Sequence, residues 1–195
     1  MKRFIDFILA LIILVIGFPL FIFIAICIYM EDGRPIFFRQ TRPGFMEKPF
    51  NIIKFRTMKE DINMDVSNDL NRITKVGKFL RITSLDELPE IWNILKGEMS
   101  FVGPRPLLNE YLDLYSAEHR LRHSIKPGIT GWAQINGRNN IDWNQKLSLD
   151  IWYIENRTLF LDIKIIFITI IKVIQRRDVN KEGFSTSDKF QGYEK

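Results

Sequence analysis

The chain has 195 residues, enough to bury the core of one domain, and 46% of them are hydrophobic. Lys and Arg number 28 against 23 Asp and Glu, a mild basic excess that suits phosphorylated substrates, anionic lipid or nucleic acid without choosing among them. The only cysteine, Cys27, excludes an intrachain disulfide, so nothing points to an oxidising compartment.

The N-terminal segment predicts a membrane anchor. Residues 7–30 carry no charge, and a helix of that length is ~36 Å long, against a bilayer core of ~30 Å. Pro19 near the middle removes a backbone donor and favours a bend. Basic residues, which prefer the cytoplasmic side, flank both ends. The residues alone leave two alternatives, a straight single span and a re-entrant helix over residues 1–30 that bends at Pro19.

The sequence after residue 30 is mixed and polar, and it predicts a fold that is mostly α with a small β element. Loose alternation over residues 35–58 predicts two short strands around Pro43-Gly44. A charged loop with a short helix is expected over 59–71, an irregular glycine-rich segment over 127–141 and a polar tail over 178–195. Helices are expected over residues 76–82, 87–95, 107–122, 144–155 and 160–176.

The last of these helices, 160–176, is apolar but carries Lys164 and Lys172. It is too short to span a bilayer. It either packs into the core or lies in the membrane interface with its lysines reaching for the headgroups.

The candidate chemistry centres on Asp86 and Glu87. Ser84 and Glu87 fit a capping box, but Pro89 favours a helix that begins at Asp86, because proline is tolerated only in the first turn. Both carboxylates would then lie at a helix N-terminus, where they either complement the dipole or meet a bound phosphate. An aspartate at such a place can attack phosphorus and form an acyl phosphate.

Several basic residues surround this pair in the sequence. Lys54 and Arg56 share one face of a predicted strand, and Arg81 lies five residues before Asp86. Prolines fix the backbone on both sides of Arg105, whose planar guanidinium suits phosphate oxygens. The alternative for each is a solvated surface charge.

A third polar element lies within residues 126–139. Its glycines and its alternating side chains predict either an extended segment whose polar face meets a ligand or an ordinary loop with a buried Trp; the alternating residues are Trp132, Gln134, Asn136 and Arg138. His119 and His123 are four residues apart, as helix metal ligands can be. No carboxylate or cysteine partner accompanies them in the sequence, so both are predicted to be surface residues.

Taken together, these segments resemble the monotopic phosphoglycosyl transferases, also called bacterial sugar transferases. The resemblance runs from about residue 2 to 192. It rests on Lys54-Phe55-Arg56-Thr57-Met58 and on residues 84–89, 96–106 and 126–138. Residues 181–190 look like the subgroup that starts protein glycosylation with bacillosamine-type amino sugars.

The resemblance implies a reaction in two steps. Asp86 attacks the β-phosphorus of a UDP-sugar and releases UMP, and polyprenyl (undecaprenyl) phosphate then takes the sugar phosphate from the carboxylate. Glu87 completes the catalytic dyad, and Mg²⁺, with Asp86 as its protein ligand, offsets the crowded negative charge. Substrate phosphates are expected to contact the basic and polar residues Lys54, Arg81, Arg105, Gln134 and Arg138.

The resemblance also implies a location. The N-terminal helix is expected to be re-entrant, although the family often has Ser where this chain has Phe18 before the proline. Residues 31–177 would form a compact catalytic domain with interfacial helices on the cytoplasmic face of the bacterial inner membrane. The implied partners are the UDP-sugar, polyprenyl phosphate and membrane lipid, and not nucleic acid. Two other classes stay open, a glycosyltransferase that releases UDP and a basic membrane scaffold without activity.

Overall fold

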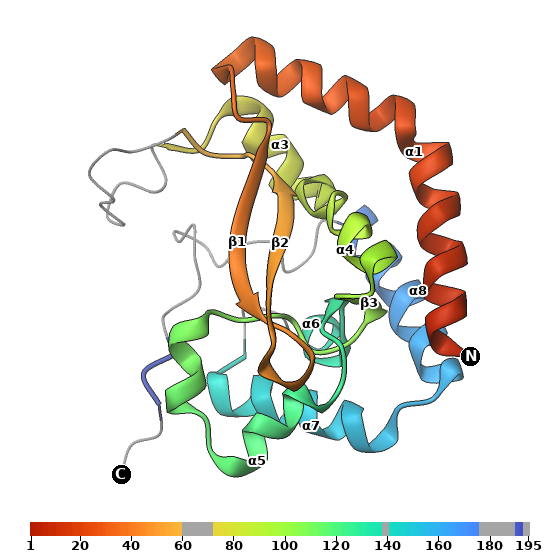
Figure 1. Cartoon of the computed structure of the whole chain (residues 1–195), viewed down its shortest axis with the longest axis vertical. Helices are drawn as coiled ribbons and strands as arrows, with labels where there is room; N and C mark the ends of the chain where they lie inside the picture. The colour runs from red at the N-terminus through yellow and green to blue at the C-terminus, as the bar shows by residue number, and fades with distance from the viewer. Residues whose placement is uncertain (60–71, 138–140, 176–189, 193–195) are drawn as a thin grey trace.

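The computed structural model describes residues 1–59, 72–137, 141–175 and 190–192. The fold is mostly helical with small sheets, as predicted from the sequence (Figure 1). Its elements in chain order are α1 (Lys2–Asp32), β1 (Phe37–Pro43), β2 (Pro49–Phe55), α3 (Lys75–Thr83), α4 (Glu90–Lys96), β3 (Ser100–Val102), α5 (Ala117–Arg120), β4 (Gly128–Thr130), α6 (Trp132–Ile135), α7 (Trp143–Asn156) and α8 (Leu159–Gln175).

The two predicted strands are confirmed as an antiparallel hairpin. Strands β1 and β2 pair from Phe37 opposite Phe55 to Pro43 opposite Pro49, around a short 3-10 turn at Phe45–Glu47. A second, parallel pair joins β3 to β4. The backbone just after β3 packs closely against β4, because a Cβ on Gly128 would stand 2.1 Å from the backbone nitrogen of Gly103. This close packing fixes the position of the first residue of the loop after β3.

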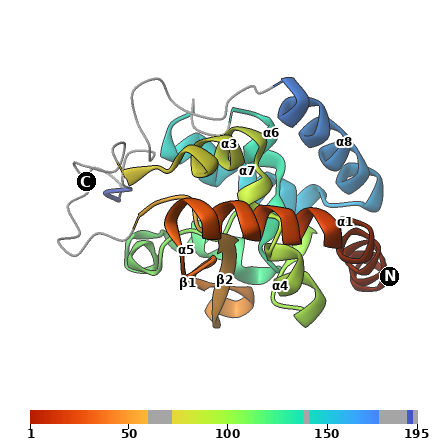
Figure 2. The same ribbon diagram turned by 90° about the horizontal axis from the view of Figure 1, so that it is seen from above.

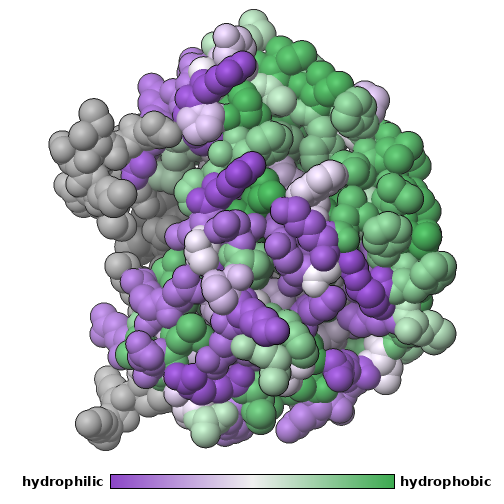
Figure 3. Space-filling model, viewed as in Figure 1, coloured by the Kyte–Doolittle hydropathy of each residue, from purple (hydrophilic) through white to green (hydrophobic). Residues whose placement is uncertain are grey.

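Helix α1 is continuous through Pro19, and its two halves run in different directions (Figure 1). It is the one helix in the described ranges that is long and apolar enough to cross a membrane, by length and composition. Its inner face is buried in the domain, with Ala10 against the β2–α4 core and Ile24 and Ile28 against Phe55. The outer face exposes large apolar side chains, which form the hydrophobic band along one edge in Figure 3.

The beginning of α1 is fixed to the domain by polar contacts. The Lys2 Nζ lies 2.5 Å from an Asp162 carboxylate oxygen of α8. The Arg3 guanidinium donates to the carbonyls of Ile94 and Leu95 at the end of α4, where helix carbonyls lack helical partners. Figure 2 shows this end of α1 beside α8. The buried Asp6 carboxylate also accepts from the Ser100 hydroxyl at 2.8 Å.

The end of α1 is fixed to the same domain. The Arg56 Nη2 lies 3.1 Å from an Asp32 carboxylate oxygen and also donates to the Asp32 carbonyl at 2.6 Å. The Glu31 carboxylate accepts from the backbone nitrogens of Lys75 and Val76, in the first turn of α3. Both ends of the apolar helix therefore contact one body.

Helix α8, predicted over 160–176, buries one face and exposes the other. Asp162 and Ile165 are buried. The opposite side chains are large, apolar and exposed, namely Phe160, Ile163, Phe167, Ile170 and Ile174. The prediction that this helix packs into the core therefore holds for one of its faces, and the other face is apolar and exposed.

Three local expectations are wrong. The predicted helix over 107–122 is broken into a 3-10 segment Asn109–Leu114, then α5, then a 3-10 segment Leu121–Ser124. The break occurs because Ser116 is extended and caps α5 by accepting from the His119 nitrogen. His119 and His123 are buried rather than on the surface. Residues 132–135 form α6 rather than an extended segment, so the alternating pattern there does not produce a polar face.

Two other expectations concern segments that the structure describes only in part. The predicted loop and short helix over 59–71 lie outside the described residues, except for Lys59. Most of the predicted polar tail is outside them too. Within that tail, however, Phe190 is buried against Tyr111, Tyr115 and Trp143. Aromatic packing therefore holds this part of the tail on the domain.

Candidate active site

Asp86 and Glu87 lie just before a helix rather than inside its first turn. They occupy a 3-10 turn, Leu85–Glu87, which follows Ser84 in the left-handed conformation. Helix α4 begins only at Glu90, with Pro89 as its N-cap residue. The Ser84 side chain makes no capping hydrogen bond, so the capping box is wrong. Pro89 explains the delay, because a residue without an N–H fits the boundary of a helix better than its interior.

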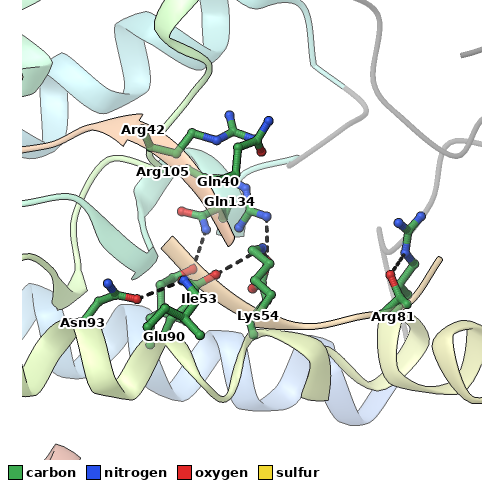
Figure 4. A network of polar contacts seen from close by, with 12 residues as sticks. Gln40, Arg42, Ile53, Lys54, Arg81, Glu90, Asn93, Arg105 and Gln134 are labelled. Atoms are coloured by element: carbon green, nitrogen blue, oxygen red, sulfur yellow. Dashed lines mark hydrogen bonds and ion pairs between the residues drawn. The ribbon is translucent and has the colours of Figure 1, made fainter. Parts of the chain in front are cut away.

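The Glu87 carboxylate forms ion pairs with two basic side chains from distant parts of the chain. Its Oε1 lies 2.7 Å from the Lys54 Nζ of β2 and 2.6 Å from the Arg105 Nη2 of the loop after β3. Glu87 is only 8% exposed. Figure 4 shows Lys54 and Arg105 converging in this network. Such charge-assisted contacts fix three side chains relative to one another.

The Asp86 carboxylate is left available. It is half-buried, and it makes no hydrogen bond or ion pair within the described ranges. Burial, followed by the neighbouring Glu87 charge, raises the pKa of Asp86 to about 6, although Lys54, Arg105 and Arg81 oppose the shift. Asp86 therefore presents unshared oxygen lone pairs next to fixed positive charge.

Sequence reasoning missed Glu90, a third carboxylate of this site. Glu90 is 1% exposed, and its Oε1 lies 3.1 Å from the Lys54 Nζ. Burial raises the pKa of Glu90 to about 7. Burial by itself lowers the pKa of Lys54, but Glu87 and Glu90 outweigh it, so that this pKa is raised and Lys54 stays charged. The spacing of three residues between Glu87 and Glu90 was the available signal, because such residues neighbour one another on a helical turn.

The other predicted contacts divide into three groups. The Arg81 Nε donates to the Thr57 hydroxyl at 2.9 Å, and the Arg81 charge acts on Asp86, so Arg81 belongs to the site. The Gln134 amide nitrogen donates to the Ile129 carbonyl, and its buried oxygen has no hydrogen-bond partner in the described part of the chain. This side chain of α6 is therefore held against the backbone of β4. Arg138 lies outside the described residues.

A buried ion pair between Arg122 and Asp150, which sequence reasoning also missed, contacts the backbone of Arg105. The Arg122 Nη2 donates to the Arg105 carbonyl at 2.7 Å and to an Asp150 carboxylate oxygen at 2.7 Å. The Arg122 Nη1 also donates to the Tyr115 hydroxyl at 3.1 Å. Arg122 and Asp150 are 3% and 2% exposed. The loop that presents the Arg105 guanidinium is therefore fixed from inside the domain.

The Asp86 carboxylate suits a metal ion that is bound jointly by the protein and by the phosphates of a substrate. No group of three or more His, Cys, Asp or Glu residues that could hold a metal ion occurs among the residues that the structure describes. Mg²⁺ is commonly held by one or two carboxylates together with substrate phosphates and water. The unpaired oxygens of Asp86 suit that mode, whereas the Glu87 Oε1 already faces two cations.

The chain is similar to known sugar transferases. The model of the bacterial sugar transferase family matches residues 1–176. An uncharacterized sugar transferase of Bacillus subtilis is 44% identical over 194 residues, which cover 98% of this chain and 96% of that protein. The UDP-glucose:undecaprenyl-phosphate glucose-1-phosphate transferase of Escherichia coli is 44% identical over 185 residues, and the undecaprenyl-phosphate galactose phosphotransferase of Salmonella typhimurium is 39% identical over 198 residues.

The last two relatives are longer proteins. The matched regions cover 88% and 91% of this chain but only 40% and 41% of those two proteins. The B. subtilis relative, by contrast, matches over nearly its whole length. Since the family model spans far more than half of the chain, the protein belongs to the bacterial sugar transferase family and is a transferase.

Proposed function

We propose that the protein is a phosphoglycosyl transferase, which moves a sugar 1-phosphate from a UDP-sugar to undecaprenyl phosphate and releases UMP. The single observation that carries this proposal is the Asp86 carboxylate, which has no polar partner in the described residues and feels the charges of Lys54 and Arg105, which Glu87 holds in place. A nucleophile next to fixed cations suits attack on a phosphorus that carries negative charge. The printed names of the E. coli and S. typhimurium relatives describe reactions of this kind.

In the first step an Asp86 oxygen attacks the β-phosphorus of the UDP-sugar. The bond from that phosphorus to the bridging oxygen breaks, and UMP leaves with the oxygen and the electron pair. A sugar phosphate remains on the carboxylate as an acyl phosphate. We expect Lys54, Arg81 and Arg105, whose charges act on Asp86, to neutralise the charge that moves onto the departing phosphate.

In the second step an oxygen of undecaprenyl phosphate attacks the same phosphorus. The bond to the Asp86 oxygen breaks, the carboxylate is restored and the product is an undecaprenyl diphosphate sugar. Glu87 orients Lys54 and Arg105 in both steps, since both cations contact its Oε1. Asp86 is the protein group that would hold Mg²⁺, and such a cation would supply charge neutralisation between carboxylate and diphosphate.

The nucleotide product tests this function. Purified protein in vesicles that contain undecaprenyl phosphate should release UMP from a UDP-sugar, whereas UDP would indicate a glycosyltransferase that breaks the sugar–phosphate bond. We propose an N-acetylated amino sugar as donor and protein glycosylation as the use of the product, because residues 181–190 resemble the subgroup that uses such sugars. Relatives are named for glucose and galactose, so the panel should include UDP-glucose and UDP-galactose beside UDP-linked N-acetylated amino sugars.

Arg105→Lys should lower kcat/KM by roughly 10- to 150-fold, measured as UMP release. Lysine keeps the charge but loses the planar fork, and one charge-assisted hydrogen bond contributes ~1.5–3 kcal/mol. Arg39→Lys is a matched control, because it makes the same change at an exposed position of β1, on the face of the hairpin opposite to Lys54. Wild-type activity of Arg105→Lys would show that Arg105 only shapes its loop.

We further propose that α1 is re-entrant and that both of its ends lie on the cytoplasmic face with the catalytic domain. A straight helix of 31 residues would be ~46 Å long and would separate its ends across a bilayer. The contacts from Lys2 and Arg3 to α8 and α4, and from Asp32 to Arg56, bring both ends to one domain instead. The change of direction and Pro19 support the same topology.

A membrane-impermeant thiol reagent should therefore fail to label a cysteine at position 2 in intact cells, and it should label that cysteine once the inner membrane is permeabilised. The test protein needs Cys27→Ser, so that the engineered cysteine is the only one. Pro19→Ala restores the missing N–H, and it should shift the helix toward a spanning topology with loss of activity. Ready labelling of intact cells with Pro19 in place would show that α1 spans.

A further inference from the structure

The hairpin carries a guanidinium that the site described above does not use. In the β1–β2 register, Gln40 is opposite Ile52 and Arg42 is opposite Phe50. Paired residues lie on the same face of a sheet, and alternate residues of one strand share a face. Gln40 and Arg42 therefore continue along the face of the hairpin that carries Lys54, toward the loop of Arg105 (Figure 4).

Arg42 has a neutral hydrogen-bond partner, and among the described residues no carboxylate forms an ion pair with it, although the Glu90 charge acts on it from further away. Its Nη2 donates to the Gln40 side-chain oxygen at 2.5 Å. Its Nε is buried without a hydrogen-bond partner, and Arg42 forms no ion pair with a carboxylate in the part of the chain that the structure describes. Burial, followed by repulsion from Arg105, lowers the pKa of Arg42 to about 10. Figure 4 shows the Arg42 and Arg105 side chains near one another, in keeping with this repulsion. Of the two, Arg105 forms an ion pair with Glu87, whereas Arg42 forms none in the described residues.

A half-buried cation next to a like charge is unfavourable unless an anion joins it. A phosphate group offers several oxygens and can accept from two guanidinium groups at once. Gln40 limits the directions that the Arg42 side chain can take, so less freedom is lost when an anion binds. The arrangement is therefore suited to a phosphate placed between Arg42 and Arg105.

We propose that Arg42, oriented by Gln40, is a substrate-binding residue that contacts a phosphate oxygen beside Arg105. This inference rests on the proposed function, because it assumes that the ligand of the Asp86 site carries phosphate. The chemistry has two sources, the diphosphate of the UDP-sugar and the phosphate of undecaprenyl phosphate. They are separated by measuring each half of the reaction by itself.

The test compares Arg42→Gln with Arg39→Gln. Arg39 lies on the same strand but on its opposite face and is exposed, so the control makes the same change of charge away from the site. We measure KM for the UDP-sugar, KM for undecaprenyl phosphate in vesicles, and formation of the Asp86 adduct from UDP-sugar alone. Arg42→Gln should raise one KM about 10-fold or more, whereas Arg39→Gln should change both by less than about twofold.

The pattern identifies the source of the phosphate. A slower adduct and a raised KM for the UDP-sugar assign Arg42 to the donor, whereas a normal adduct with a raised KM for undecaprenyl phosphate assigns it to the acceptor. Both KM values within about twofold of those of Arg39→Gln would overturn the proposal. Should Arg42→Gln unfold in the assay, Arg42→Lys keeps the charge without the fork, and unchanged KM values there would overturn it equally.

Failure of the proposed function can be recognised separately. If the wild-type protein releases no UMP from any UDP-sugar, the transferase reaction proposed above is wrong. The role of Arg42 is then tested by calorimetry, in which the protein is titrated with UDP-sugar or with vesicles that contain undecaprenyl phosphate and the dissociation constants are measured. A dissociation constant raised about 10-fold or more in Arg42→Gln relative to Arg39→Gln supports a phosphate contact, and equal dissociation constants for both ligands overturn it.

Discussion

Asp86→Asn should abolish turnover and leave the fold intact. The substitution is nearly isosteric, and Asp86 makes no hydrogen bond or ion pair in the described residues, so the fold loses no contact that depends on its charge. An amide lacks the negative oxygen that attacks phosphorus, which should reduce UMP release to background. The thermal midpoint of the variant should stay close to that of the wild type.

The covalent intermediate gives this prediction a second measurement. Wild-type protein that receives a UDP-sugar without undecaprenyl phosphate should gain the mass of one sugar phosphate after rapid quenching, on the peptide that contains Asp86. Asp86→Asn should show no such gain. Asp113→Asn is a matched control, because Asp113 is exposed and lies outside the site. The two-step mechanism would be wrong if the wild type formed no adduct and its kinetics showed that both substrates must be bound in a ternary complex.

Asp150→Ala should lower the free energy of unfolding by ~3–5 kcal/mol, because it leaves the Arg122 guanidinium charged and buried without its carboxylate. For a protein of this size the loss corresponds to a fall of roughly 6–20 °C in the thermal midpoint. Glu155→Ala, on an exposed position of α7, removes the same charge and should change the midpoint little. A fall no larger than that of the control would mean that the pair contributes nothing to stability.

The double variant Arg122→Met with Asp150→Leu separates the contribution of this ion pair to protein stability from its role in positioning Arg105. Replacing both members of a buried pair by apolar residues is often neutral or stabilising, so the midpoint should recover much of its loss. The kcat/KM of the double variant should nevertheless be lower than that of the wild type, because the Arg105 carbonyl loses the hydrogen bond from the Arg122 Nη2. Recovery of both the midpoint and kcat/KM would show that Arg122 does not position Arg105.

The sequence by itself determined the local elements. Uncharged residues 7–30 predicted the apolar helix, and alternation around Pro43-Gly44 predicted the hairpin. Each of these signals acts over a few neighbouring residues. The motif residues Asp86 and Glu87 were likewise found from the sequence. Segment 107–122 was predicted wrongly, because Ser116 adopts an extended conformation and caps α5 instead of continuing one helix.

Only the tertiary structure decided which charges meet. Glu87 pairs with Lys54 from 33 positions before it and with Arg105 from 18 positions after it, and no local pattern encodes these distances. Glu90, Arg122 and Asp150 look like ordinary surface charges in the sequence, because burial depends on packing between distant elements. Likewise, the uncharged run and Pro19 allowed a straight or a bent helix, whereas the polar contacts that join both ends of α1 to one domain are long-range and exist only once the chain has folded.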